Sequence, residues 1–377
     1  MHILIPALHR PLRPTGVCRH AANLANCLID TARVDQVTLL VGAWQKSYFS
    51  TLLPKNAEKI NLQYVDIKNS SLSRNFWFLL GLPKLANSLR PDIVHMSFPL
   101  PFIRSRFDAP VVSTIHDLYP YEFPENFGKA RATFNKLFLK QSIAGSDGLC
   151  CVSQMTKAAL EHYFDRISSR KKVSVVYNYV DFSDVSPRIP KSFEADPQVP
   201  FLMSVAQHRK NKNLDWLIQA YSSRLRTKQI SETTQLVIVG STGPESDNLE
   251  TLVRTLHLQD KVRFLSALDD SELCWLYQNS QLFVIPSSTE GFCLPLVEAL
   301  ASGCRVVCSD IPIFREVGSS ACTFFDLENQ PIKKLETAIG EAMASSHTKD
   351  SSVDKQFSKS HVAEQLLNFY TALTPTD

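Results

Sequence analysis

The sequence predicts an α/β protein of two doubly wound domains, each with a mostly parallel sheet between layers of helices. Three observations predict this fold class. Short, continuous apolar runs typical of buried parallel strands alternate with helical patterns along most of the chain. A length of 377 residues is long for a single hydrophobic core. A stretch rich in proline, serine and charge, from Phe182 to Pro200, separates two such alternating regions.

Each half of the chain repeats the strand-then-helix pattern of βα units. In the first half we expect strands at 2–7, 37–41, 92–95, 111–115 and 148–153, and helices near 17–30, 73–89, 128–145 and 155–163. In the second half we expect strands near 201–205, 235–240, 261–265, 282–285 and 304–308, with helices between them.

These elements place a first Rossmann-like domain at 1–183, a linker at 184–200 and a second Rossmann-like domain at 201–345. Residues 346–377 form a polar segment followed by an amphipathic helix over 361–373. Open α/β sheets bind ligands at the carboxyl ends of their strands, so we expect the two domains to face each other across a cleft.

The composition is that of an ordinary soluble globular protein, with 44% hydrophobic and 20% charged residues. No run of about 18 uncharged apolar residues occurs, and the chain starts directly in a strand pattern, so we expect a cytoplasmic protein. The nine cysteines are scattered and odd in number, which favours reduced, buried thiols. Cys304 and Cys308 lack a second ligand pair, so we expect no metal site.

The charge is divided unevenly between the two halves. Residues 1–183 carry 22 Lys and Arg against 13 Asp and Glu, whereas residues 184–377 carry 18 against 24. The basic half can rest on the anionic inner face of a membrane or meet a phosphate-bearing acceptor. The alternative is that surface charge merely differs between domains. Nucleic acid is a poor partner, because the basic residues are not regularly interleaved with aromatic ones.

The most informative stretch is 286–303, which places Glu290 and Glu298 on either side of a strand-to-helix turn. The apolar run 282–285 predicts a buried strand, Pro295 suits the first turn of the next helix, and Gly303 ends that helix. Such a turn directs backbone N–H groups and the positive end of a helix dipole toward the carboxyl edge of the sheet, where a diphosphate binds well. The carboxylates can accept hydrogen bonds from sugar and ribose hydroxyls.

This pattern resembles the E-x7-E signature of retaining GT-B glycosyltransferases of the large family 4 group. Other segments resemble motifs of that family in the same order: Thr15-Gly16, Ile115-His-Asp117, Asn178-Tyr-Val-Asp181, the basic loop 206–214, Val237-Ile-Val-Gly240 and Val262-Arg-Phe-Leu265. The resemblance covers nearly the whole chain. Each motif is weak alone, but their order and spacing together are specific.

The resemblance implies a GT-B enzyme that moves a hexosyl group, mannosyl or glucosyl, from a nucleoside-diphosphate sugar to a hydroxyl acceptor with retention. It implies that Lys212 and Arg209 hold the phosphates, that Glu298 holds the ribose, and that Glu290 and His116 position the sugar. Asp117 would orient the imidazole or cap the next turn. The remaining donor contacts would come from Gly16, Gly240, Val262, Arg263, Phe264, Gly291, Phe292, Cys293 and Leu294. The C-terminal helix would cross back onto the first domain.

No cofactor and no metal are expected, because the chain has no Asp-x-Asp motif and cations at a helix start can stabilise the leaving diphosphate. In the basic loop, Gln207 stands where the family often has arginine, which makes Lys212 the firmer assignment. The acceptor would be a polysaccharide, a lipid-linked chain or a small molecule.

Structural roles remain open for several of these residues. Glu290 could be a first-turn acid, and Glu298 could pair with Arg305. Arg209 could be a solvated side chain, and His116 could be a core residue at a strand end. Gly16 could serve a turn that binds no ligand.

Two rival functions also remain open at this point. One is a hydrolase or epimerase of nucleotide sugars with the same fold, and the other is a non-catalytic subunit that binds nucleotide sugars. Cys293 stands where the family has glycine, and its side chain could crowd the sugar pocket.

Two apolar clusters outside the strands can be packed helix faces or membrane contacts. They are the stretch 76–82 and the group Phe134, Leu137 and Phe138, which lies beside two lysines.

Overall fold

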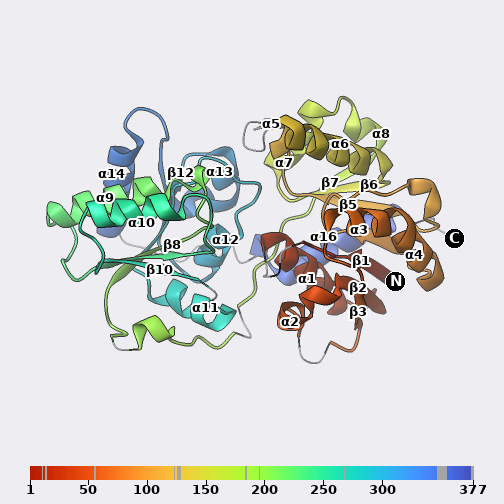
Figure 1. The fold of residues 1–377 in the computed structure, drawn as a ribbon, viewed down its shortest axis with the longest axis horizontal. Coiled ribbons are helices and arrows are strands. Elements are labelled where there is room, and N and C mark those ends of the chain that lie inside the picture. Colours follow the sequence, from red (N-terminus) through yellow and green to blue (C-terminus); the bar gives the residue numbers. More distant parts are fainter. Residues whose placement is uncertain are drawn as a thin grey trace. The chain divides into compact units, whose positions relative to one another are not determined.

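The computed structural model describes residues 1–10, 12, 15–54, 57–122, 124, 129–182, 185–194, 196–266, 268–345 and 355–374, with only the backbone for 129–131. Its contacts divide the chain into two compact units (Figure 1). The first comprises Met1–Tyr179 and Ser358–Asp377, and the second comprises Val180–Phe357. The expected linker 184–200 therefore belongs to the second unit, and the chain returns to the first unit at Ser358.

The first unit contains a seven-stranded sheet in the order β3-β2-β1-β4-β5-β6-β7, and all the strand pairs in it are parallel. The strands are β1 (His2–Pro6), β2 (Gln36–Gly42), β3 (Ile60–Val65), β4 (Ile93–Met96), β5 (Val111–Ile115), β6 (Gly148–Cys151) and β7 (Lys172–Val175). The α-helices are α1 (Gly16–Ile29), α2 (Lys46–Phe49), α3 (Ser71–Phe76), α4 (Leu82–Leu89), α5 (Tyr119–Glu122), α6 (Lys129–Gly145), α7 (Gln154–Tyr163), α8 (Ile167–Arg170) and α16 (Lys359–Thr371). A π-helical turn, Trp77–Gly81, joins α3 to α4.

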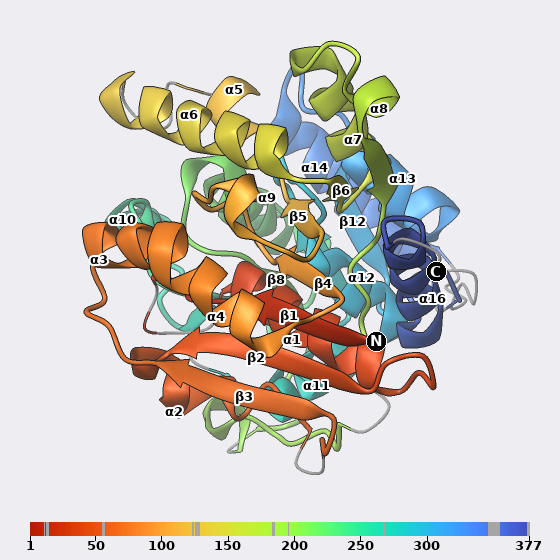
Figure 2. The same cartoon turned by 90° about the vertical axis from the view of Figure 1, so that its right-hand side faces the viewer.

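Side chains that alternate along β1 explain why helices cover both faces of this sheet (Figure 2). Ile3 and Ile5 pack with α1 and α16 in one core cluster. Leu4, between them, packs with Phe78 of the π turn and Leu82 of α4 in another. A strand buried on both faces must be apolar at every position, which is why the sequence shows continuous apolar runs.

The second unit contains a six-stranded parallel sheet in the order β10-β9-β8-β11-β12-β13. Its strands are β8 (Phe201–Val205), β9 (Gln235–Val239), β10 (Val262–Leu265), β11 (Leu282–Ile285), β12 (Val306–Ser309) and β13 (Cys322–Phe325). Its α-helices are α9 (Leu214–Arg226), α10 (Ser246–Thr255), α11 (Asp270–Asn279), α12 (Leu294–Ala301), α13 (Pro312–Gly318) and α14 (Pro331–Ala344). The two doubly wound sheets confirm the predicted α/β fold class.

The expected strands are all present, and the sequence missed β3, β7 and β13. Each of these lies at the edge of its sheet and is only partly buried. Polar residues such as Asn61, Lys172 and Thr323 interrupt the apolar run in each. The expected helix at 73–89 is α3, the π turn and α4 in succession.

The C-terminal helix α16 is part of the core of the first unit. Val362, Leu366 and Tyr370 form the apolar side of this amphipathic helix and are buried against α1 and the first strands. Most of the expected polar segment before it, 346–354, lies outside the described residues. None of the described helices has the length and apolar character needed to cross a bilayer.

Leu366→Ala should lower the free energy of unfolding by about 2–5 kcal/mol, because it leaves a cavity at a fully buried position. Urea denaturation measures this change. Glu364→Ala, on the exposed side of the same helix, is the matched control and should change stability by less than about 0.5 kcal/mol. Equal stabilities of the two variants would mean that α16 is not docked in solution.

Candidate functional site

The turn between β11 and α12 carries the first of the two glutamates. Helix α12 begins at Leu294, with Pro295 in its first turn, and Gly303 follows its end at a φ of 77°. Cys293 precedes the helix at φ 71° and ψ 74°, in the left-handed region that favours glycine. The family resemblance expected glycine here, so the backbone keeps the glycine conformation although the side chain has changed.

The basic loop after β8 is bound to this turn by hydrogen bonds from two asparagines. Asn213 Nδ2 donates to the carbonyl oxygen of Pro286 at 2.8 Å, and Asn211 Nδ2 donates to that of Thr289 at 3.3 Å. In return, Ser288 N donates to the carbonyl oxygen of Asn211 at 2.8 Å. Two segments 78 residues apart in the chain thus form one rigid surface at the carboxyl ends of neighbouring strands.

Lys212 and Glu290, both predicted site residues, form an ion pair across this junction. Their side chains are 17% and 12% exposed, so the pair is largely shielded from water. Arg209 is exposed, and its Nε donates to Gln207 Oε1 at 2.7 Å. The structure therefore brings the lysine to the glutamate turn, while Arg209 contacts its own loop.

Glu298 lies on α12 with 8% of its surface exposed and accepts a hydrogen bond from the Tyr277 hydroxyl at 2.9 Å. Burial and the neighbouring carboxylate raise the pKa of Tyr277 well above its usual value, so the phenol stays protonated and donates. Arg305, the alternative partner weighed from sequence, donates instead to the backbone oxygens of Met343 and Ser345.

Two glycines after β9 serve packing between loops. A Cβ on Gly240 would collide with the carbonyl oxygen of Ala206, and one on Gly243 would collide with that of His208. Both positions must be glycine for the basic loop to lie against the loop after β9. The protein itself therefore requires Gly240, whatever ligand it contacts.

The residues predicted to line the base lie on the edge strand β10, which includes Val262. Arg263 donates to the backbone oxygen of Ser192 and stacks over the ring of Phe193, with 4.8 Å to the ring centroid. Phe264 packs edge-on against His208, with 5.3 Å between centroids. The Arg263 side chain thus contacts Ser192 and Phe193, which lie in the stretch 184–200 that we expected to be a linker.

The other predicted residues of the glutamate turn, 291–294, differ in how far they are buried. Phe292 is buried and packs against Phe357 at 5.7 Å between ring centroids. Gly291 is half-buried just before it, and Leu294 opens α12. Burial and the nearby Glu290 carboxylate raise the pKa of the Cys293 thiol well above its usual value, so the thiol is neutral.

In the first unit, His116 directly follows β5. Its Nε2 donates to the carbonyl oxygen of Ser97 at 2.8 Å, and burial lowers the pKa of the ring. The neutral ring then carries no proton on Nδ1, which is left as an acceptor. Asp117 caps the next turn by accepting from Tyr119 N at 3.1 Å. A Cβ on Gly16 would meet no atom within 4 Å, so the described protein leaves open space there.

A chain of hydrogen bonds that the sequence did not reveal runs through the first unit from Tyr370 to Asn178. Tyr370 of α16 donates to His95 Nδ1, and His95 Nε2 donates to Thr114 Oγ1 at 2.8 Å. Thr114 donates to His20 Nε2 at 3.2 Å, and His20 Nδ1 donates to Asn178 Oδ1. Burial lowers the pKa of His95 to about 3, so the chain connects neutral rings.

His20 joins this chain to His116, because the two rings meet edge-on at 4.7 Å between centroids. His9 follows β1, packs against the ring of Phe98 at 4.6 Å, and is 5% exposed. Neither of its ring nitrogens has a hydrogen-bond partner among the described residues. Burial, with smaller contributions from His116 and Arg74, lowers the pKa of His9 to about 3.

Sequence reasoning missed Tyr277, the two asparagines, His9 and His20. A signal existed for some of them, since His9 lies shortly after the first expected strand and Asn211 and Asn213 flank Lys212. Nothing in the sequence linked Tyr277 to Glu298. Within the described ranges, no cluster of three or more His, Cys, Asp or Glu residues could hold a metal ion. The second unit thus presents a shielded cation–carboxylate pair and a buried carboxylate, a set suited to phosphate and hydroxyl groups.

Two family models match successive parts of the chain. The model described as Glycosyltransferase Family 4 matches residues 14–184, and the model described as Glycosyl transferases group 1 matches residues 185–355.

Curated proteins and solved structures resemble the chain over most of its length. It is 26% identical to the O-antigen chain mannosyltransferase RfbU of Salmonella typhimurium, over 86% of both chains. It is also 26% identical to the O-antigen chain mannosyltransferase B of Escherichia coli, over 95% of this chain and 96% of the relative. The structure of Anabaena HepE in complex with UDP and glucose has the same fold, with a TM-score of 0.67 at 16% identity over 99% of this chain and 100% of the other.

The backbone at position 293 can be tested by comparing two variants that both lack the thiol. Cys293→Gly should be more stable than Cys293→Ala by about 1 kcal/mol, because alanine is disfavoured at positive φ. At Cys304, which is also buried but has no positive φ, the alanine variant should be the more stable one. Thermal or urea denaturation measures both differences. If the alanine variant were the more stable one at position 293 as well, residue 293 would not be left-handed.

His9→Phe should reduce the loss of unfolding free energy that the protein suffers as the pH falls. The folded pKa of about 3 lies below the ordinary 6.5, so the unfolded chain binds a proton that the folded one does not, and stability is lost as the pH falls from 6.5 toward 3. Removing the ring nitrogens should reduce this slope by up to about 1.4 kcal/mol per pH unit, without breaking a described hydrogen bond. Urea denaturation across this pH range measures the slope, and parallel profiles for both proteins would contradict a neutral, buried His9.

Proposed function

The chain belongs to the family 4, group 1 glycosyltransferases and has their GT-B fold, and from this premise we propose that it transfers a hexosyl group from a nucleoside-diphosphate sugar to a hydroxyl acceptor with retention of configuration. The observation that carries the proposal is the junction between the basic loop and the glutamate turn. It brings Lys212 to Glu290 beside the start of α12, where a diphosphate and a sugar could be held together.

The diphosphate would bind at Lys212. An ammonium group has three N–H donors, so Lys212 can keep one bond to Glu290 and give another to a phosphate oxygen. The positive end of the α12 dipole adds attraction for the same anion. The exposed Arg209 side chain, which donates to Gln207 of its own loop, can turn toward the outer phosphate once the donor binds.

The ribose would bind at Glu298. One of its oxygens, Oε2, accepts from Tyr277, which orients the carboxylate. Ribose hydroxyls would donate to this carboxylate and replace the water that an anion otherwise needs. Tyr277 is therefore a positioning residue in this proposal.

The family resemblance implies that Glu290 and His116 each contact the sugar. Since His116 Nε2 donates to Ser97, the ring would accept a hydrogen bond from a sugar hydroxyl through Nδ1. In the same-face displacement that the family implies, the acceptor oxygen bonds to the anomeric carbon as the bond to the phosphate oxygen breaks. The departing phosphate takes the acceptor proton.

No cofactor or metal is part of this proposal. The negative charge that develops on the leaving diphosphate would be stabilised by Lys212, Arg209 and the helix terminus. Lys212 and the helix terminus are preorganised, because the asparagine bonds hold the lysine loop to the glutamate turn before the donor arrives.

We propose a mannosyl group in preference to a glucosyl group, because two relatives that match most of the chain are O-antigen chain mannosyltransferases. The acceptor would be a growing, lipid-linked polysaccharide at the cytoplasmic face of a membrane. The related fold of a protein solved with UDP and glucose leaves both uridine and guanosine donors to be tested.

Lys212→Ala should weaken nucleoside-diphosphate binding about tenfold or more, because a lost hydrogen bond to a charged group costs about 1.5–3 kcal/mol. Isothermal titration with GDP and UDP measures the affinity and identifies the base. Lys333→Ala, an exposed position on α14, is the matched control and should bind like the wild type.

Transfer is tested with GDP-mannose, UDP-glucose and lipid-linked acceptors, and NMR of the product shows the anomeric configuration. Equal nucleotide affinities for the two lysine variants would remove Lys212 from the donor site. Release of free sugar that no acceptor suppresses would support a hydrolase, and an inverted product would contradict retention.

A further inference from the structure

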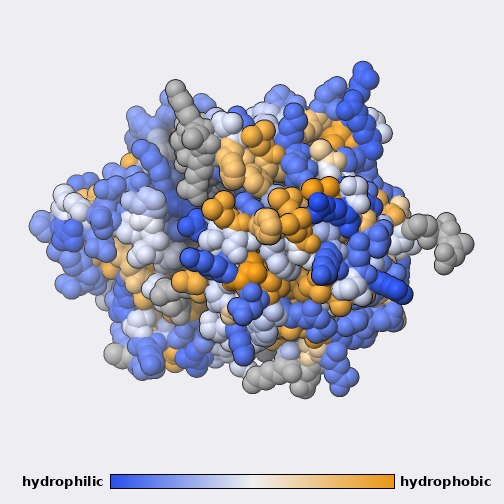
Figure 3. Space-filling model, turned by 45° about the vertical axis from the view of Figure 1, so that its right-hand side comes forward, coloured by the Kyte–Doolittle hydropathy of each residue, from blue (hydrophilic) through white to orange (hydrophobic). Residues whose placement is uncertain are grey.

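Buried polar atoms without partners gather around the loop that follows β1, residues 7–10. Hydrophilic and apolar residues are interspersed on the face shown in Figure 3, so surface hydropathy alone does not mark a ligand site there. A buried polar atom without a hydrogen bond is a more specific sign, because leaving it unpaired costs free energy. Three residues at this loop carry such atoms among the described residues: His9 (Nδ1 and Nε2), Asn69 (Oδ1) and Arg74 (Nε).

The loop itself is held through its backbone. Three consecutive backbone oxygens, those of residues 8–10, each accept a hydrogen bond from a side chain of another segment. The donors are, in order, Arg74 Nη1 at 3.3 Å, Trp44 Nε1 at 2.9 Å and Asn69 Nδ2 at 3.0 Å. Arg74 lies on α3, Asn69 just before it, and Trp44 in the turn after β2. The loop is therefore fixed without the unpartnered atoms, which are left for a ligand.

The same loop brings two arginines together. Arg10 is exposed and Arg74 is half-buried, and no ion pair engages either of them among the described residues. Burial, and after it the charge of Arg10, lowers the pKa of Arg74, so the two guanidinium groups are close enough to repel each other. An anion bound by both would offset this repulsion.

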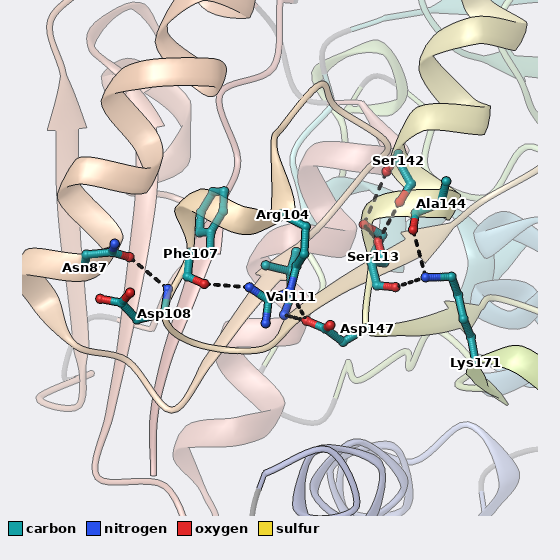
Figure 4. Close-up of polar contacts among 11 residues, drawn as sticks. Asn87, Arg104, Phe107, Asp108, Val111, Ser113, Ser142, Ala144, Asp147 and Lys171 are labelled. Carbon is teal, nitrogen blue, oxygen red and sulfur yellow. Dashed lines mark hydrogen bonds and ion pairs between the residues drawn. The ribbon is translucent and has the colours of Figure 1, made fainter.

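Another half-buried arginine of the first unit shows how such a charge is balanced within the protein (Figure 4). Arg104, like Arg74, donates to a backbone oxygen, that of Phe107, at 2.6 Å. Its side chain also pairs with Asp147 at 2.6 Å, and this aspartate accepts from Val111 N at 2.7 Å. Within the described ranges Arg74 has the backbone bond but no such carboxylate, and a ligand can supply one.

The loop lies next to the histidine that is proposed to contact the sugar. Strands β1, β4 and β5 are neighbours in the sheet, and His9, Phe98 and His116 lie just beyond their ends. His9 packs against Phe98 at 4.6 Å between ring centroids, and both His116 and Arg74 contribute to its lowered pKa. A sugar at His116 therefore has His9, and then the arginines, as its next neighbours along the carboxyl edge.

The unpartnered atoms require a ligand with both donors and acceptors. Arg74 Nε can only donate, and Asn69 Oδ1 can only accept. The neutral His9 ring offers one donor and one acceptor. An anion without hydroxyl groups would satisfy Arg74 but not Asn69, whereas a sugar with an acidic group satisfies all three residues.

We propose that the loop after β1 is a subsite for an acidic sugar of the acceptor, with Arg10 and Arg74 on its carboxylate or phosphate and His9 and Asn69 on its hydroxyls. The exposed Arg10 forms the entrance to this subsite, and His9, which is 5% exposed, forms its inner end. This inference rests on the proposed transfer to a hydroxyl acceptor, and it narrows that acceptor to a glycan that carries an acidic sugar.

The test is titration of the full chain with glucuronic acid, mannose 6-phosphate and neutral mannose, followed by saturation-transfer NMR. Each titration is run with and without saturating GDP and UDP, so that phosphate binding at Lys212 is separated from binding at the loop. At least one anionic sugar should bind about tenfold more tightly than mannose, because charge-assisted hydrogen bonds are about twice as strong as neutral ones. The comparison of the two anionic sugars shows whether the acidic group is a carboxylate or a phosphate.

Arg10→Gln should weaken binding of the anionic sugar about tenfold or more and leave mannose binding unchanged, because it removes a hydrogen bond to a charged group. This variant should fold normally, since the side chain is exposed and the bond from Asn69 uses only the backbone of residue 10. Arg74→Gln should have the same effect on the anionic sugar. Arg170→Gln, at an exposed position on α8, is the matched control and should bind like the wild type.

Titration of every variant with GDP and UDP tests donor binding separately. A wild type that binds an anionic sugar but no nucleotide would contradict the proposed donor site and support the subsite. Three results would overturn the subsite. They are equal wild-type affinity for anionic and neutral sugars, equal affinity of the Arg10 and Arg170 variants for the anionic sugar, and loss of nucleotide binding in Arg10→Gln, which would assign the arginines to the donor diphosphate.

Discussion

The hydrogen bonds between the basic loop and the glutamate turn are the constraint on which the candidate donor site depends. Asn211 and Asn213 connect the two segments through backbone oxygens, so the geometry does not depend on charge. Asn213 adopts a left-handed conformation at φ 47°, which asparagine tolerates better than most residues. Without these bonds Lys212 and Glu290 would be separate loop residues, and their mutual attraction would have to offset the entropy of ordering both loops.

The two units build their polar sites by different means. In the second unit, charge is kept near the surface of the turn and is paired. In the first unit, neutral imidazoles are buried and linked through hydroxyls, because burial lowers their pKa values. A neutral histidine network binds hydroxyl groups without attracting a counter-ion, whereas a cation with a carboxylate suits a diphosphate and a sugar.

Much of the fold could be predicted, because buried strands and helix ends leave local signals. The strand at 282–285, the helix start at Pro295 and its end at Gly303 lie where the sequence placed them. The edge strands β3 and β13 were not predicted, since half-buried strands carry no continuous apolar run. The π turn within 73–89 also left no sequence signal, because its apolar residues fit an α-helix equally well.

Local order in the chain was enough to identify the fold and the family, because hydrophobic periodicity and turn chemistry act over a few residues. The partner of each side chain required the folded molecule. Glu298 meets Tyr277, Gly240 accommodates Ala206, and Arg263 turns to Phe193. These pairs join segments far apart in the chain, and only the packing of strands and helices determines which of them come within a few ångströms of each other.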